Sequence, residues 1–231
     1  MINLKIAIQK SGRLNEDSLT LLKECGISIN NGKDQLMAQA SNFRLDVLYL
    51  RNSDIPQYVR DGVADIAIIG DNTEKEKKTG IRHVLDLGFS RCRLSIAVPK
   101  NVDFQDISYL QGKKIATSYP NSLKDFLTEN DIEAEIHEIS GSVEIAPNIG
   151  LADAICDLVS SGSTLFKNGL KEVYKIFESQ AILVANSGLC GEKQELLAQL
   201  VFRIKAVLAA KYNKYILLNA PEKALDRICR L

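Results

Sequence analysis

The sequence contains few of the residues that build metal centres and histidine-dependent catalytic sites. It has two histidines among 231 residues, and neither His83 nor His137 has a partner at metal-ligand spacing. The five cysteines are scattered and form no Cys-x-x-Cys pair. A zinc site and a Ser-His-Asp triad are therefore not expected. Because Cys25 and Cys156 lie in apolar segments, we expect buried free thiols in a reducing compartment.

Net charge and long apolar runs are also lacking. Twenty-nine Lys and Arg residues balance 29 Asp and Glu residues, so the formal net charge is zero. A balanced charge argues against an extended electrostatic grip on nucleic acid or an anionic membrane. The sequence shows no membrane-length apolar run and no signal-peptide core. With 45% hydrophobic and 25% charged residues, we expect a cytoplasmic globular protein of one large domain or two lobes.

Short apolar runs alternate with helical patterns along the chain, which predicts an α/β fold with mostly parallel sheets. Strands are predicted at residues 5–8, 46–50, 66–69, 94–98, 114–116, 134–136, 154–159, 175–178 and 181–185. Helices are predicted at residues 17–25, 54–61, 123–130, 163–168 and 193–212. The last of these carries an apolar stripe at helical spacing, so we expect it to pack on its own lobe.

Two short patterns recur in the same order in each half of the chain. Residues 5–7 and 114–116 both read Lys-Ile-Ala, and residues 62–65 and 150–153 share Gly-x-Ala-Asp. A polar loop follows each pattern, and ligands in open α/β sheets bind beyond the carboxyl ends of strands. The repeat predicts two similar lobes with four loops around a central cleft. We expect lobe I at 1–92 plus 179–231, and lobe II at 93–178.

The stretch 141–170 contains the most informative pattern. A strand that carries Asp153 and Asp157 runs into Ser-Ser-Gly-Ser-Thr at 160–164, where a helical pattern begins. Free N–H groups and hydroxyls at a helix N-terminus favour an anion, whereas carboxylates suit sugar hydroxyls or a metal ion. Together they indicate a sugar phosphate. An ordinary turn and helix cap is the alternative interpretation.

Basic residues follow other predicted strands. Residues 10–13 read Lys-Ser-Gly-Arg, which fits either a polyphosphate grip or a solvated turn with a helix cap. Arg51 lies between a strand and a helix, from which it can reach into the cleft. Arg91 and Arg93 flank the expected hinge, where arginine fits a phosphate contact or an ion pair with Asp86 or another carboxylate.

These residues resemble the ATP phosphoribosyltransferase family. Its signature runs Glu, five residues, Gly, a small residue, Ile or Val, Asp and then Ser/Thr-Gly-x-Thr-Leu/Met. Every position is met, by Glu144, Gly150, Ala152, Ile155, Asp157, Ser161, Gly162, Thr164 and Leu165. Residues 8–14, 51–56, 68–72 and 116–120 also look like family blocks. The resemblance therefore covers essentially the whole chain.

The resemblance implies the first step of histidine biosynthesis, a pentosyl transfer. The adenine N1 of ATP attacks C1 of phosphoribosyl pyrophosphate, which gives N1-(5-phosphoribosyl)-ATP and pyrophosphate. Magnesium accompanies the pyrophosphate and is held mainly by the substrate, with no dedicated protein ligands. The family's two-lobed fold, like that of type II periplasmic binding proteins, agrees with the repeat. No nucleophile is needed, so positioning and cationic stabilisation can suffice.

By the same resemblance, each site residue has an expected role. The phosphoribosyl pyrophosphate site is expected to comprise Glu144, Asp153, Asp157, Ser160, Ser161, Gly162, Ser163 and Thr164. The ATP site is expected to comprise Gln9, Lys10, Ser11, Gly12, Arg13, Gly70, Asp71, Arg93, Ser118 and Tyr119. Arg51 and Arg13 are expected to be catalytic, by stabilising the departing charge.

The family has short forms, which need a separate regulatory subunit, and long forms with a C-terminal regulatory domain. The length of this chain fits a short form, whereas residues 10–13 and 214–221 look like a long form. We expect a long-form catalytic core without its regulatory domain. A homodimer or higher homo-oligomer is the expected assembly, and a separate regulatory subunit is the less favoured alternative.

Overall fold

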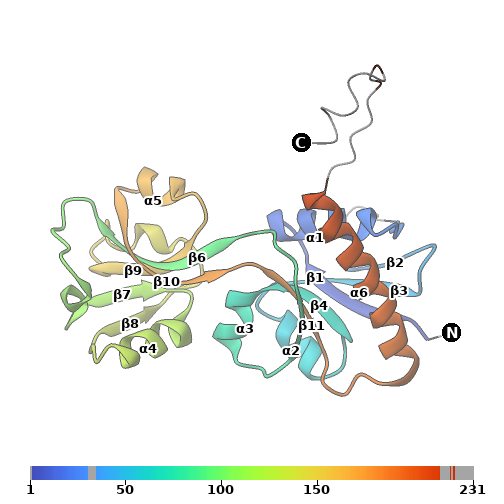
Figure 1. Cartoon of the computed structure of the whole chain (residues 1–231). Coiled ribbons are helices and arrows are strands. Elements are labelled where there is room, and N and C mark those ends of the chain that lie inside the picture. The colour runs from blue at the N-terminus through green and yellow to red at the C-terminus, as the bar shows by residue number, and fades with distance from the viewer. Residues whose placement is uncertain (1, 31–34, 214–218, 220, 222–231) are drawn as a thin grey trace.

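The computed structural model describes residues 2–30, 35–213, 219 and 221, and its elements group around two separate sheets (Figure 1). One sheet has six strands in the order β2-β3-β1-β4-β11-β5, and the other has five in the order β10-β6-β9-β7-β8. We call the part built on the first sheet lobe I and the part built on the second lobe II. The stretch 214–218, which the long-form comparison used, lies outside the described residues.

Lobe I contains six strands and four helices within the described residues. Its strands are β1 (Leu4–Gln9), β2 (Met37–Gln39), β3 (Leu45–Leu50), β4 (Ile66–Gly70), β5 (Arg82–Asp86) and β11 (Ala181–Ala185). Its helices are α1 (Arg13–Glu24), α2 (Ile55–Arg60), α3 (Asp71–Lys77) and α6 (Gly191–Tyr212). In α6, Leu196, Leu197, Leu200 and Ile204 are buried in the same cluster as β1 and α1. The prediction that this helix packs on its own lobe is confirmed.

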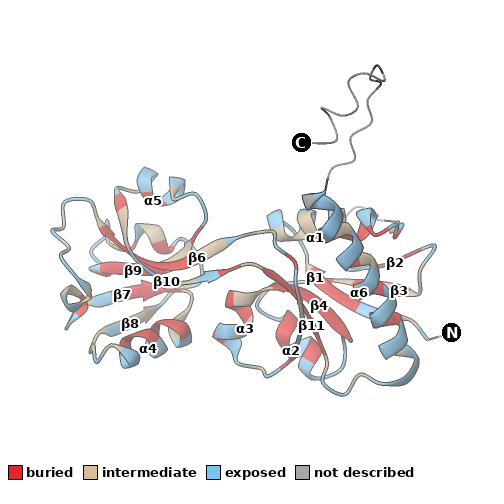
Figure 2. Ribbon diagram, in the orientation of Figure 1, coloured by how far each residue is buried: buried red, intermediate tan, exposed pale blue. Residues whose placement is uncertain are grey.

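Lobe II is likewise built from a sheet with helices packed on it. Its strands are β6 (Cys92–Pro99), β7 (Lys114–Thr117), β8 (Glu135–Glu138), β9 (Ala154–Val159) and β10 (Leu170–Ser179). Its helices are α4 (Pro120–Glu129) and α5 (Ser163–Lys167), with 3-10 turns η1 (Ile107–Leu110) and η2 (Val143–Ile145). Burial concentrates on the central strands of both lobes, as Figure 2 shows. The α/β class is confirmed.

The sheets are mixed, not mostly parallel as the alternation predicted. Strand β1 is parallel to β3 and β4, and β7 is parallel to β8 and β9, while the remaining pairs are antiparallel. The reason is that the chain crosses between lobes as extended strand. β10 passes directly into β11 at Gln180 with no crossover helix, so these strands enter both sheets antiparallel.

A long antiparallel ribbon joins the lobes. Strands β6 and β10 pair from Cys92 opposite Ser179 to Pro99 opposite Leu170, and Figure 1 shows both running from one lobe toward the other. Helix α3 follows β4 directly, where the sequence predicted a polar loop at 70–72. It was missed because Asp71–Lys77 contains no apolar residue and therefore no helical hydrophobic period.

The sequence repeat corresponds to the same pair of hydrogen bonds between neighbouring strands in both lobes. In lobe I, the Asp65 carboxylate accepts the Lys5 N–H at 2.8 Å, and the Asp65 N–H donates to the Lys5 carbonyl at 2.9 Å. In lobe II, Asp153 and Lys114 exchange the equivalent bonds at 2.9 and 2.8 Å. Each pair locks the start of one parallel strand against the next. The carboxyl ends of those strands therefore share one edge.

Two of the cysteines behave as the composition indicated. Cys25 and Cys156 are buried free thiols, and burial raises the pKa of Cys25 to about 11. Cys92 is half-buried and Cys190 is exposed, so the expectation of burial does not hold for Cys190. Among the described residues, no helix is both long and apolar enough to cross a membrane.

Asp65 is 5% exposed and also accepts the Lys193 ammonium at 2.7 Å. We expect Asp65→Ala to lower the free energy of unfolding by about 2–4 kcal/mol, because it leaves a buried N–H without its acceptor and a lysine without its partner. The exposed counterpart, Asp153→Ala, should cost only about 1 kcal/mol. Urea unfolding at neutral pH measures both, and equal losses would contradict this ranking.

Candidate active site

The carboxyl ends of the parallel strands in each lobe face the other lobe. In lobe I, β1, β3 and β4 end side by side, because Gln9 pairs with Leu50 and β4 lies on the other side of β1. The loops after them begin at Lys10, Arg51 and Gly70. In lobe II, the parallel strands β7 and β9 run in the same direction, with Thr117 beside Cys156, and lead into the loops at 118–119 and 160–162. Arg13 reaches across, and its Nη1 lies 3.4 Å from Ser160 Oγ.

A cavity of about 580 Å³ lies where the edges meet the ribbon. Its wall comes from both lobes and from both crossing segments, and consists of Asp71, Asp86, Arg91, Cys92, Arg93, Ser160, Glu178, Ser179, Gln180 and Ile182. Three candidate site residues, Asp71, Arg93 and Ser160, therefore share one wall. The cavity mixes cationic, acidic and hydroxyl groups, which suits a charged and polar ligand.

The loop after β9 forms a second, smaller cavity of about 150 Å³. Most of the predicted sugar-phosphate residues line it: Glu144, Asp157, Ser160, Ser161, Gly162 and Thr164. Gly162 has φ +78°, a left-handed conformation that side chains rarely adopt, so glycine is needed for this turn. Helix α5 has only five residues, so the hydroxyls and amides of the loop contribute more to an anion site than the helix dipole.

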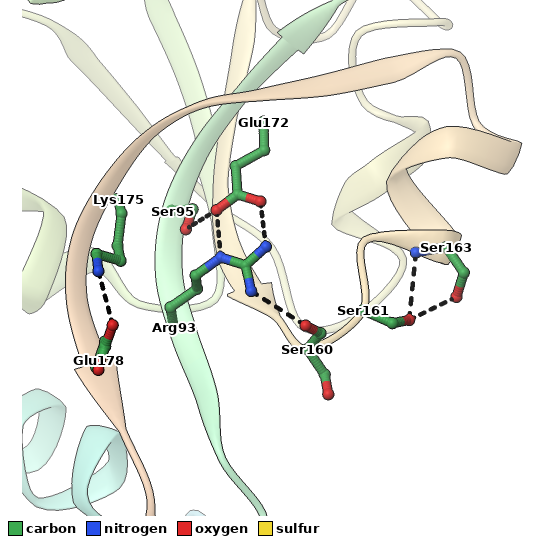
Figure 3. A network of polar contacts seen from close by, with 8 residues as sticks. All are labelled: Arg93, Ser95, Ser160, Ser161, Ser163, Glu172, Lys175 and Glu178. Carbon is green, nitrogen blue, oxygen red and sulfur yellow. Dashed lines mark hydrogen bonds and ion pairs between the residues drawn. The ribbon is translucent and has the colours of Figure 1, made fainter.

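The remaining two members of that predicted set lie differently. Ser163 is not part of the cavity wall, and its Oγ lies 3.1 Å from Ser161 Oγ (Figure 3). Asp153 precedes β9, whereas the loop follows it, so the whole six-residue strand separates them by about 20 Å. Its carboxylate is bonded to the Lys114 N–H. The expected contact of Asp153 with ligand does not fit this placement, and we assign Asp153 to strand alignment.

Arg93 forms an ion pair within lobe II. Figure 3 shows its guanidinium facing Glu172, with two bonds at 2.5 Å, while Nη1 donates to the Ser160 carbonyl at 3.1 Å. Ser95 Oγ adds a bond to the same carboxylate at 2.8 Å. The Arg93 hydrogen bonds hold the pKa of Glu172 below its usual range. The alternative of an ion pair with a carboxylate is thus confirmed for Arg93, with Glu172 and not Asp86 as the partner, and Arg93 also bonds to the first residue of the 160–164 loop.

Asp157 is the most perturbed carboxyl group at the site. Burial, with the nearby charge of Glu144, raises its pKa to about 6, although the Leu158 N–H donates to it at 2.8 Å. Tyr119, which precedes α4, is also affected: burial and then the Asp157 charge raise the Tyr119 pKa. Asp157 therefore gains from any ligand that donates hydrogen bonds to its ionised form.

The lobe I candidates have more open surroundings. Gly12 caps α1 at φ +86°, which fixes the turn that follows Gln9. The Arg13 side chain is 68% exposed, and its Nε lies 3.8 Å from Asp17. Lys10, Ser11 and Arg51 are exposed, and within the described residues the Arg51 guanidinium has no hydrogen-bond or ion-pair partner. These cations are available to a ligand in the cleft.

Two further candidates are partly committed to structure. The Ser118 hydroxyl donates to the Ile139 carbonyl at 2.6 Å, and its expected ATP contact stays a prediction. A Cβ added at Gly70 would lie 2.3 Å from Asn72 Oδ1, so any larger residue would displace the Asn72 side chain.

Sequence reasoning missed several residues at the site. Asn72 exchanges hydrogen bonds with Ser179, with N–H to Oγ and Oγ to Oδ1 both at 2.9 Å. Gln180 accepts the Asp71 N–H at 2.9 Å, and Glu172 holds Arg93. The polar Glu-Ser-Gln at 178–180 between two apolar strands was the available signal for a cleft-lining crossing. No sequence signal pairs Glu172 with Arg93.

The Arg93–Glu172 pair generates a first prediction for this site. Glu172→Gln removes the charge that holds the guanidinium, so we expect faster backbone hydrogen exchange in residues 160–164 and a loss of about 1–2 kcal/mol in unfolding free energy. Lys175→Ala breaks a neighbouring exposed pair with Glu178 and should change neither quantity. Unaltered exchange of the loop in Glu172→Gln would show that the pair does not hold it.

Asp157 generates a prediction about pH. Its folded-state pKa of about 6 exceeds the ordinary value of 3.8, so the folded chain binds a proton that the unfolded chain releases. Its contribution to stability therefore falls as pH rises from about 4 to about 6, by about 1–2 kcal/mol for a partly buried group. Asp157→Asn should remove this decline, and Glu144→Gln should move it to lower pH. Denaturant titrations between pH 4 and 7 measure the slope; the same slope in Asp157→Asn would contradict the assignment.

Comparison with known proteins agrees with this geometry. A family model described as HisG: ATP phosphoribosyltransferase matches residues 51–206, which include the cleft loops of both lobes after Arg51. An ATP phosphoribosyltransferase of Cytophaga hutchinsonii is 57% identical over 228 residues, covering 99% of this chain and 80% of that protein.

Solved structures show the same similarity. The ATP phosphoribosyl transferase (HisG:HisZ) complex from Thermotoga maritima contains a chain with TM-score 0.77 and 29% identity, covering 90% of this chain and 99% of that one. A substrate binding protein of an amino acid ABC transporter has TM-score 0.60 at 12% identity, covering 91% and 95%, which is a likeness of fold alone. The expected similarity to periplasmic binding proteins is thereby confirmed. The family match and the identity over nearly the whole chain place it in the ATP phosphoribosyltransferase family.

Proposed function

We propose that this chain performs its family's reaction in the cleft between the lobes. The adenine N1 of ATP displaces pyrophosphate from C1 of phosphoribosyl pyrophosphate. The observation that carries the proposal is the meeting of two unlike walls. A hydroxyl-rich loop beside the Glu144–Asp157 pair lines one, and the cation-bearing loops of lobe I line the other, within reach at Arg13 and Ser160. A functional division at 1–92 plus 179–231 and 93–178 follows from this arrangement.

Lobe II is suited to the phosphoribosyl group. The amides and hydroxyls of Ser160, Ser161, Gly162 and Thr164 surround a cavity of about 150 Å³, a size that suits a 5-phosphate. Asp157 and Glu144 on the same wall would accept hydrogen bonds from the ribose hydroxyls. Ser163 supports the loop through its hydrogen bond with Ser161, and Arg93 supports it by donating to the Ser160 carbonyl.

Lobe I is suited to ATP and to the departing pyrophosphate. Lys10, Arg13 and Arg51 bring positive charge to the strand ends, and Asp71 and Tyr119 flank the entrance to lobe II. Displacement at an anomeric carbon builds positive charge on the sugar and negative charge on the leaving group. Positioning of the two substrates and cationic stabilisation of pyrophosphate therefore supply the catalysis, without a protein nucleophile.

Magnesium fits this site as a substrate-borne ion. Among the described residues, no cluster of three or more His, Cys, Asp or Glu is arranged to hold a metal. Magnesium commonly needs only one or two protein carboxylates when phosphates complete its shell, so the pyrophosphate oxygens of the substrate would hold most of the ion's shell. Held there, the ion would neutralise charge on the pyrophosphate.

We also propose that the chain assembles as a homo-oligomer. Ile149 and Phe166 on lobe II are 66% and 70% exposed, and the Asn148 side chain bonds to the Asn168 carbonyl at 3.0 Å, which joins their two segments. This apolar surface is available for burial between copies. The Thermotoga maritima structure contains a HisZ chain as well, so a separate subunit is the alternative.

The reaction is tested by incubating the purified chain with ATP, phosphoribosyl pyrophosphate and magnesium and following the ultraviolet absorbance of the N1-substituted product. Arg51→Ala should lower kcat by about 10- to 100-fold with a smaller change in KM, because its charge acts on the departing group. The exposed Arg60→Ala, which removes a cation paired with Asp61, is the control. A pure KM defect in Arg51→Ala would assign that residue to binding, and absence of product would reject the function.

A further inference from the structure

Glu76 is a buried carboxylate that the proposed chemistry does not use. It lies near the end of α3 in lobe I and is 5% exposed. Its partners belong to the other lobe. Asn121 N–H donates to Oε1 at 3.0 Å, and Ser122 donates to Oε2 from its N–H at 2.9 Å and from its hydroxyl at 2.8 Å. The Asn121 side chain adds a bond to the Glu76 carbonyl at 3.1 Å.

These bonds cap a helix of lobe II with a side chain of lobe I. Helix α4 begins at Pro120, and its own N-cap residue, Tyr119, provides no side-chain cap. The first N–H groups of a helix need acceptors, and a carboxylate is favoured there by the helix dipole. Charge-assisted bonds of this kind are stronger than neutral ones. Separating the lobes would leave both the buried charge and the helix end without these partners.

The other polar contacts between the two helices and loops are weaker. Lys78 pairs with Asp125 of α4 at 2.6 Å, but both side chains are at least half exposed, and such pairs contribute little. The Arg13–Ser160 contact is long, at 3.4 Å, and exposed. Among the described residues, Glu76 is therefore the most buried charged side chain that forms hydrogen bonds between the lobes.

The same contact orders the entrance of the cleft. Helix α3 starts at Asp71 and Asn72, directly after β4, while Tyr119 immediately precedes α4. Asn72 exchanges two hydrogen bonds with Ser179 of β10, both at 2.9 Å. Helix α3 is thus bonded to lobe II at two points, through Glu76 near one end and through Asn72 at the other. These bonds hold the loop after β4 against lobe II.

We propose that Glu76 is a positioning residue for the transfer reaction: by capping α4 from α3 it holds the two lobes at the separation at which ATP in lobe I meets the phosphoribosyl group in lobe II. This role rests on the proposed function. It predicts that loss of the carboxylate affects turnover of the two bound substrates more than binding of the sugar substrate, whose proposed contacts lie in lobe II alone.

The test compares Glu76→Gln with Glu74→Gln. Glu74 lies on the same helix, but its carboxylate accepts from Thr79 and Gly80 within lobe I, so it is a matched control. We expect Glu76→Gln to lower kcat by about 10- to 100-fold, with the dissociation constant of phosphoribosyl pyrophosphate alone changed less than about twofold. Hydrogen exchange at the Asn121 and Ser122 amides should accelerate by about tenfold or more. Glu74→Gln should retain both wild-type values.

Two results would overturn the proposal. One is unchanged exchange at Asn121 and Ser122 in Glu76→Gln, which would show that the carboxylate does not hold α4. The other is accelerated exchange with kcat within about twofold of wild type, which would show that the contact does not position the reaction. If Glu76→Gln does not fold, Ser122→Ala, which removes one of the three bonds, should show a smaller change of the same kind.

The experiment separates this proposal from the proposed function. If the wild type makes no product, the proposed function is rejected. Amide exchange and the interlobe separation from small-angle scattering still test whether Glu76 holds α4. A larger radius of gyration in Glu76→Gln than in Glu74→Gln supports it, and identical scattering with identical exchange rejects it.

Discussion

The structure depends on an aspartate whose carboxylate accepts a backbone N–H of a neighbouring parallel strand, while its own N–H donates to a carbonyl of the same residue there. Asp65 does this to Lys5 in lobe I, and Asp153 does it to Lys114 in lobe II. Parallel strands have no tight turn to set their register, so a side-chain bond at the strand start can set it instead. Each lobe consequently presents its strand ends, and the loops after them, at one edge.

A second constraint turns these two edges toward each other. The chain crosses between lobes as strand, and β6 and β10 form one ribbon that belongs to lobe II while its ends reach lobe I. Polar side chains then connect the parts of the molecule around this ribbon. Arg93 and Glu172 link it to the loop after β9, and Glu76 links α3 to α4. The cleft is therefore defined by ionic contacts around an extended hinge.

The distribution of charge in the cleft suits a reaction that needs little covalent help. The hydroxyl-rich loop at 160–164 and the Glu144–Asp157 pair are in lobe II, while exposed cations lie at the strand ends of lobe I. A sugar with developing positive charge and a leaving group with developing negative charge can each be met by the appropriate wall. Catalysis of this kind depends on preorganisation of the two walls rather than on a reactive side chain.

The sequence by itself determined the α/β class, the two-fold repeat and the loop at 160–164, because hydrophobic period, the Lys-Ile-Ala and Gly-x-Ala-Asp patterns and the family signature are all local. Only the tertiary structure decided the mixed sheets, the polar helix α3, the commitment of Arg93 to Glu172 and the structural use of Asp153. These features depend on residues far apart in the chain. A carboxylate that caps a helix end or aligns a strand has the same sequence signature as one that binds a ligand, so only its partners in space distinguish the two.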